Sequence, residues 1–244
     1  MTKKSQTISP ETLKLEVQVP PPSLSMRSHL SIRYLHAASM FTRRCWHLES
    51  NNIKSGIEEN SYYAMAAIKF SYSAIEANIN EFYQNLVDNV IFPDIEHQIG
   101  LEKIHTLSRV WNYIKRRNTL DKYETVMIFT DNVTYSQEGK ATKEIYDKAK
   151  DLEKLRDALI HYKPEDSLKQ NIHKTIEKSL SKYKIPISMY HNKSNLPYFP
   201  DKCLGHGLSE WSLITSIDFI NRFYLKLGVT RIANIYERRS YPTR

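Results

Sequence analysis

The sequence contains little glycine and very little cysteine. Only 6 glycines are spread over 244 residues, which disfavours a β protein built on many tight turns. The two cysteines, Cys45 and Cys203, are too few for a disulfide framework and are typical of a reducing compartment. No apolar run approaches the roughly 20 residues of a membrane helix, and the N-terminus lacks the apolar core of a signal peptide. We therefore expect a cytoplasmic protein without a membrane span.

Several motifs of common enzyme classes are also missing. The sequence has no G-x-x-x-x-G-K-[ST] or G-x-G-x-x-G nucleotide loop, no G-x-S-x-G elbow and no H-E-x-x-H helix. Cys45 with His47 and Cys203 with His206 are far apart in the chain and lack the close pairs of a structural zinc site. We therefore expect neither a metal nor a cofactor.

The charge of the chain is strongly basic. The formal net charge is +8 and the isoelectric point is about 9.2, which suits a polyanionic partner, with nucleic acid the first candidate. The alternative is that the lysines and arginines only solvate the surface. The candidate RNA-binding residues are Lys115, Arg116, Arg117 and Lys163.

Apolar residues recur at spacings of three and four, which predicts an all-α fold. We expect an antiparallel helical bundle whose central helix is long. The expected helices cover residues 25–50, 58–91, 101–117, 121–130, 141–163, 167–182 and 207–227. Gly228 follows the last of these helices and is expected to close it. Glu76 and Glu81 on the central helix are expected to solvate its polar face.

Three regions of the chain are expected to differ in organisation. Residues 1–24 form an arm, partly extended or disordered, in which residues 13–19 alternate like a short strand that a proline run ends. Residues 25–230 form the helical domain, including a long, proline-containing loop at 183–206. Residues 231–244 form a basic C-terminal tail.

Arg156 and His161 lie five residues apart near the end of the helix expected at 141–163. This spacing separates them by roughly 140° around one helix, so a second copy of the helix across a two-fold axis is needed to place each Arg beside the other copy's His. A fixed guanidinium and an imidazole that titrates near neutrality suffice for metal-free phosphodiester cleavage. The alternative is a helix end that carries basic residues for its dipole.

The stretch from Arg156 to His161, RDALIH, resembles the R-x4-6-H motif of the HEPN superfamily (higher eukaryotes and prokaryotes nucleotide-binding domains). Asp157 matches the polar residue that usually follows the Arg there. The segments at 73–83 and 201–228 resemble helices of uncharacterised bacterial HEPN-like proteins, so the resemblance covers about residues 25–230.

This resemblance implies an all-α, often dimeric protein, and many such proteins are metal-independent ribonucleases of toxin–antitoxin, phage-defence or RNA-processing systems. Arg156 would hold the scissile phosphate, His161 would transfer protons, and Asp157 would orient the Arg. Some toxins carry R-x4-H-x-Y, whose Tyr a partner nucleotidyltransferase modifies. Here Tyr162 follows the His directly and Lys163 takes the motif position, so Tyr162 is a supporting residue and its modification is in doubt.

The leading hypothesis is a homodimeric endoribonuclease that cleaves single-stranded RNA without metal, with an antitoxin or nucleotidyltransferase as a further partner. The alternative is a non-catalytic HEPN-like module that binds RNA, a nucleotide or a protein. A third hypothesis is a plain helical scaffold.

Overall fold

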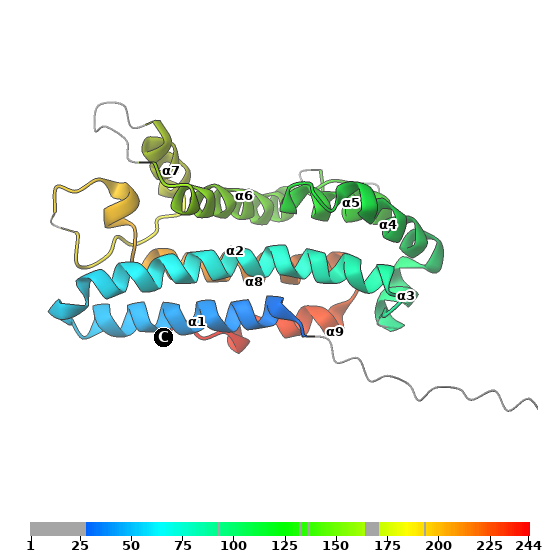
Figure 1. Ribbon diagram of the computed structural model, residues 1–244, viewed down its shortest axis with the longest axis horizontal. Coiled ribbons are helices and arrows are strands. Elements are labelled where there is room, and N and C mark those ends of the chain that lie inside the picture. Colours follow the sequence, from blue (N-terminus) through cyan, green and yellow to red (C-terminus); the bar gives the residue numbers. More distant parts are fainter. Residues whose placement is uncertain (1–27, 92, 132, 136, 164–170, 193) are drawn as a thin grey trace, which may run out of the picture.

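The computed structural model describes residues 28–91, 93–131, 133–135, 137–163, 171–192 and 194–244. The described part of the chain is an all-α helical bundle without a strand (Figure 1), which confirms the predicted fold class. The short strand expected at 13–19 lies outside the described residues. None of the described helices has the length and apolar character to cross a membrane. The longer helices are α1 (Leu30–Ser50), α2 (Ile57–Val87), α4 (Leu101–Ile114), α5 (Thr119–Asp131), α6 (Lys140–Ile160), α7 (Asn171–Ser181) and α8 (His206–Lys226).

The long central helix α2 lies beside α1, and α8 packs against both of them and against α6 (Figure 1). The apolar stripe of α2 is buried as its spacing predicts. Its members are Ile68, Tyr72, Ile75, Ile79, Phe82 and Leu86. Val90, expected in the same helix, is exposed beyond its end. Pro93 opens the short helix α3 (Pro93–Ile99), because proline is tolerated in a first helical turn.

A buried polar network joins α2, α5, α8 and the C-terminal segment. The Tyr123 hydroxyl lies 2.9 Å from the Ile75 carbonyl oxygen and 3.0 Å from Oδ1 of Asn78. The Asn78 amide in turn donates to the hydroxyls of Tyr224 and Tyr236, at 3.2 and 3.0 Å. Because buried polar groups without partners are costly, this network fixes the register of the packed elements.

Two carboxylates cap helices that are distant in the sequence. Glu81 of α2 accepts hydrogen bonds from the backbone N–H groups of Leu30 and Ser31 at 2.6 and 3.0 Å, and so caps α1. Glu49 accepts from the N–H of His206 at 2.9 Å, at the start of α8. The sequence predicted only that Glu81 solvates the polar face of α2. The structure shows that Glu81 also caps α1.

The C-terminal residues fold against the bundle. Gly228 closes α8 with a φ of 73°, and the N–H of Val229 donates to the carbonyl of Tyr224 at 2.9 Å, which confirms the predicted role of this glycine. The segment predicted as a basic tail, 231–244, contains helical turns and buries Tyr236 and Tyr241. Burial of these aromatic side chains holds the segment against the bundle.

Candidate active site

Arg156 lies about one turn before the end of α6 and is held against α2. Its guanidinium lies 4.3 Å from the centroid of the Tyr72 ring, and Nη1 is 2.9 Å from Oδ1 of Asp157. Nη2 lies 3.8 Å from a carboxylate oxygen of Glu76. The side chain is 20% exposed. A cation over an aromatic face beside two carboxylates has little freedom to move, so the guanidinium is fixed in place while its edge still reaches solvent.

Tyr72 forms the floor of this site and connects three helices. It is fully buried on α2, and its hydroxyl donates to the carboxylate of Glu153 on α6. Thr119, at the start of α5, also interacts with this hydroxyl, and burial together with Glu153 holds the pKa of Tyr72 well above its usual value. The phenol therefore stays neutral and links α2 to α6 through its hydrogen bond.

His161 lies one residue beyond the helix that was expected to contain it. α6 ends at Ile160, and the N–H of His161 donates to the carbonyl of Asp157 at 2.8 Å. The helix was predicted to continue to 163. The backbone of His161 has already left the helical region, with a φ of −103° and a ψ of 36°, three residues before the proline that bars helical continuation. The exposed His161 is thus a C-cap residue.

His161 lines a cavity of 400 Å³ between α6 and α7. Lys154, Asp157 and Lys163 contribute charged groups to this cavity, and Ile176 contributes apolar surface. Two lysines and an imidazole around one cavity suit a phosphate group, although Asp157 offsets part of the positive charge. The predicted residues Asp157, His161 and Lys163 are therefore brought together here.

Tyr162 contacts the same cavity from a different direction. Its ring stacks on the imidazole of His173 on α7, with 5.7 Å between the ring centroids. His173 is buried and meets the edge of Phe199 at 5.2 Å. This packing ties the end of α6 to α7 and gives Tyr162 a supporting position.

Within one chain, Arg156 and His161 do not share a cavity. Arg156 is not among the residues around the His161 cavity, because its side chain extends over Tyr72 on α2. Long helical side chains point back toward the helix N-terminus, and five residues already add about 7.5 Å along the axis. In one chain, the Arg156 and His161 side chains therefore lie at different sites, as their predicted separation of about 140° around the helix implies.

The predicted RNA-binding cluster lies in the turn between α4 and α5. α4 was expected to reach residue 117 but ends at Ile114, so Lys115, Arg116 and Arg117 follow the helix as exposed residues. Asn118 then starts α5 by accepting a hydrogen bond from the N–H of Leu120 at 2.8 Å. This short turn holds three cations close to Thr119, which contacts the floor of the Arg156 site.

Three residues of the candidate site were not predicted from the sequence as site residues: Tyr72, Glu76 and Glu153. Tyr72 was assigned to the apolar stripe, and Glu76 to a solvated helix face. Glu76 lies within the segment at 73–83 that resembles a helix of HEPN-like proteins. Its place in that segment was the one indication in the sequence that Glu76 could belong to the site. Nothing in the local pattern distinguishes Glu153 from the other charged residues of α6.

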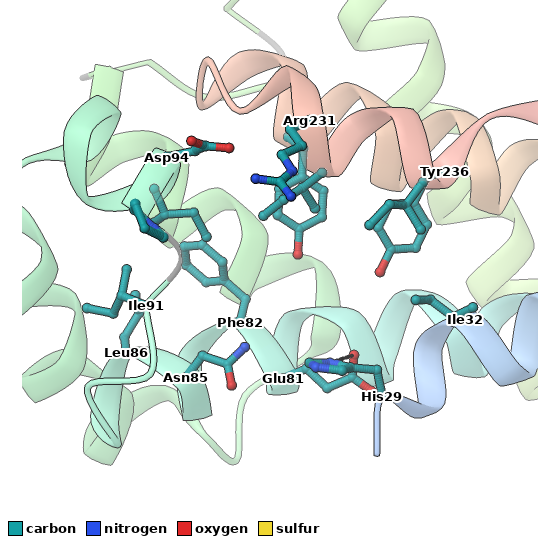
Figure 2. A pocket seen from close by; sticks show the side chains of 15 residues that line it. His29, Ile32, Glu81, Phe82, Asn85, Leu86, Ile91, Asp94, Arg231 and Tyr236 are labelled. Carbon is teal, nitrogen blue, oxygen red and sulfur yellow. Dashed lines mark ion pairs between the residues drawn. The ribbon is translucent and has the colours of Figure 1, made fainter. Parts of the chain in front are cut away.

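A second cavity, of 260 Å³, lies at the other end of the bundle between α2 and the C-terminal segment. Its walls are mainly apolar, and Arg231 and Asp94 lie on one side with Glu81 and His29 on the opposite side (Figure 2). The Glu81 carboxylate already caps α1 and lies 3.4 Å from His29. None of the predicted site residues lines this cavity.

The two cysteines are buried, and neither lines the His161 cavity. The Cys45 thiol donates to the carbonyl of Asn60, and the Cys203 thiol to that of Pro200, both at 3.5 Å. Within the described ranges, no three His, Cys, Asp or Glu side chains gather closely enough to hold a metal ion.

Comparison of the chain with models of protein families, with curated proteins and with solved structures finds no match.

Proposed function

We propose that this chain is a HEPN-type endoribonuclease that cleaves single-stranded RNA without a metal ion. The observation that carries the proposal is the placement of Arg156, whose guanidinium is fixed over Tyr72 beside Asp157 and Glu76 while one edge remains open. A charge that is oriented before the substrate arrives stabilises a transition state without reorganisation. The exposed basic turn 115–117 immediately precedes α5 and would supply further contacts for phosphate.

The proposed reaction uses the ribose itself as nucleophile. His161 removes the proton of the 2′-hydroxyl, whose oxygen attacks the adjacent phosphorus while the bond to the 5′-oxygen breaks. A second imidazole, from the other copy, returns a proton to the leaving 5′-oxygen. The products are a 2′,3′-cyclic phosphate and a 5′-hydroxyl. Arg156 neutralises the charge that develops on the phosphoryl oxygens.

A homodimer completes this proposed site. Because Arg156 and His161 do not share a cavity in one chain, a second copy packed across a two-fold axis would pair each Arg with the other copy's His. The exposed Ile160, Tyr162 and Ile172 near His161 supply apolar surface for such a contact.

In this proposal the protein acts in the cytoplasm as a toxin or phage-defence effector. Control by an antitoxin or by a nucleotidyltransferase partner belongs to the same proposal. Tyr162 is 46% exposed and would be the residue to examine for modification.

The alternative function is a non-catalytic module that binds RNA, a nucleotide or a protein. One observation favours it: Arg156 already has two carboxylates within 4 Å, Asp157 at 2.9 Å and Glu76 at 3.8 Å, and this pairing reduces its attraction for phosphate. The 260 Å³ cavity offers such a module a place for a small amphipathic ligand.

The deciding experiment compares the wild type with His161→Ala. Both proteins are incubated with a labelled single-stranded RNA in excess EDTA, and the 3′ ends of any products are identified. The ribonuclease proposal expects cyclic-phosphate ends from the wild type alone. Intact RNA with wild-type protein that is shown to be dimeric by sedimentation would leave the binding module as the function.

A further inference from the structure

The exposed side of α4 combines cations with an unusually exposed aromatic ring. Residues 103–120 contain five lysines and arginines and no Asp or Glu. Tyr113 is 84% exposed, more than any other large apolar or aromatic side chain recorded as exposed in the described part of the chain. Because the ring is so exposed, its face is accessible for stacking on a ligand.

Only one of the five cations of this segment has a hydrogen-bond partner within the described residues. Lys103 donates to the carbonyl of Thr130. By contrast, none of the side chains of Arg109, Lys115, Arg116 and Arg117 has an ion-pair or hydrogen-bond partner in the residues that the structure describes. Like charges repel one another, and the described part of the chain provides no counter-charge for these four.

Helical geometry places these groups on one stripe. Arg109 and His105 precede Tyr113 by four and eight residues, so the three side chains fall within about 80° around α4. All three are exposed, and the basic turn 115–117 continues the stripe at the end of the helix. From His105 to Tyr113 the helical part of the stripe extends about 12 Å.

The stripe leads to the candidate active site. The turn after Arg117 leads directly into α5, where the Tyr123 hydroxyl donates to the carbonyl of Ile75 on α2 at 2.9 Å. Ile75 lies within one helical turn of Tyr72, and the guanidinium of Arg156 lies over the Tyr72 ring. A polyanion that follows the stripe therefore arrives beside Arg156. Two carboxylates lie at the end of this path beside Arg156, Asp157 at 2.9 Å and Glu76 at 3.8 Å, and neither lies on α4.

We propose that the exposed stripe of α4, formed by His105, Arg109, Tyr113 and the turn 115–117, is a binding track for single-stranded RNA that leads the strand to Arg156. Tyr113 stacks on a base, and the cations hold the flanking phosphates. This combination of a stacking platform with a charged path suits single strands, because every unpaired base presents a face. The choice of RNA over other polyanions rests on the proposed ribonuclease function.

The test measures binding separately from cleavage. The probe is a labelled, 2′-O-methylated oligouridylate, which lacks the free hydroxyl that the proposed reaction requires, and binding is followed by fluorescence anisotropy. Tyr113→Ala should raise the Kd about tenfold, and Tyr113→Phe should stay within about twofold because the ring remains. Tyr62→Ala is the matched control, since Tyr62 is also exposed, at 56%, but lies on α2. Arg109→Gln combined with Arg116→Gln should reduce the slope of log K against log salt by about 1.4.

Each outcome decides the proposal. The track is overturned if Tyr113→Ala and Tyr62→Ala weaken binding equally. It is also overturned if neither variant weakens binding. A dimeric wild type with a monomeric Tyr113→Ala variant also overturns it, because the stripe would then join two copies. If binding depends on Tyr113 but the wild type does not cleave unmodified RNA, the track stands and the ribonuclease proposal fails. If the wild type cleaves unmodified RNA but binding does not depend on Tyr113, the ribonuclease proposal stands and the track fails.

Discussion

The guanidinium of Arg156 lies 4.3 Å from the centroid of the Tyr72 ring, so a residue of the predicted motif is packed onto the core face of the central helix. This relationship links the site to the fold. A change at Arg156 is therefore expected to affect stability as well as activity, and tests of its role need variants that separate the two effects.

Arg156→Lys should keep the fold but lose most of the cleavage activity. Lysine retains the positive charge, yet it lacks the planar fork that faces Asp157 and stacks on Tyr72. We expect the free energy of unfolding to fall by about 1 kcal/mol and cleavage to fall by about 100-fold. Urea unfolding and a single-turnover RNA assay measure these two quantities. Arg239→Lys is the control, because Arg239 is exposed and remote from Tyr72 in the sequence; equal activity of the two variants would remove Arg156 from the site.

His161→Ala should separate activity from stability more cleanly. The side chain is exposed beyond the end of α6, so its truncation opens no core cavity and should change the free energy of unfolding by less than about 0.5 kcal/mol. Cleavage should fall by about 100-fold or more if His161 transfers the proton. His97→Ala, at another exposed histidine, should cleave like the wild type. A folded His161→Ala variant with full activity contradicts the proposed chemistry.

Asp151 should make stability fall in acid. Burial disfavours its charged form, but hydrogen bonds from Lys182 and Tyr183, both at 2.7 Å, outweigh burial and leave the pKa of Asp151 below its usual value. A depressed pKa stabilises the fold above the unfolded pKa of about 3.9, and this contribution is lost as the pH falls through the lower, folded pKa.

Comparison of the wild type with Asp151→Asn tests this pH dependence. The substitution should lower the free energy of unfolding by about 1–3 kcal/mol at pH 7, and the difference should shrink below about pH 4. Urea titrations followed by circular dichroism at several pH values measure it. A difference that stays constant down to the acid transition would mean that Asp151 acts through packing and not through its charge.

The two cysteines should be inert in the folded protein. Burial raises the pKa of the Cys45 thiol to about 12 and holds that of Cys203 above its usual value, so little thiolate exists at pH 8. Iodoacetamide should label neither cysteine in the native protein, and mass spectrometry should find both labelled after unfolding. Ser55→Cys, at an exposed position, is the positive control. Rapid native labelling of Cys45 would show that α1 and α2 separate readily.

The sequence predicted the helices well because most of them carry strong apolar periodicity. The stripe of α2 from Ile68 to Leu86 was correctly identified, and Gly228 was correctly placed after α8. The helix ends were less accurate: α6 stops before His161 and α4 stops before Lys115. Local propensity does not record where tertiary contacts end a helix.

The site was only partly predictable. Arg156 and Asp157 were identified from a short motif, but their partners Tyr72 and Glu76 lie on another helix, and nothing local announces such a contact. The same reason applies to Glu81, which was expected to be solvated and instead caps α1. A single sequence shows which residues are amphipathic neighbours on one helix, whereas these contacts depend on how the helices are arranged.

The position of α8 within the bundle has a consequence for synthesis of the protein. α8 packs against α1, α2 and α6, yet it begins only at His206. While the ribosome adds the preceding residues, the apolar faces of α1, α2 and α6 that α8 will cover stay open. Such faces are aggregation-prone in incomplete chains. We expect the nascent chain to require chaperone protection until α8 leaves the exit tunnel, and chains that stop before residue 206 to be insoluble.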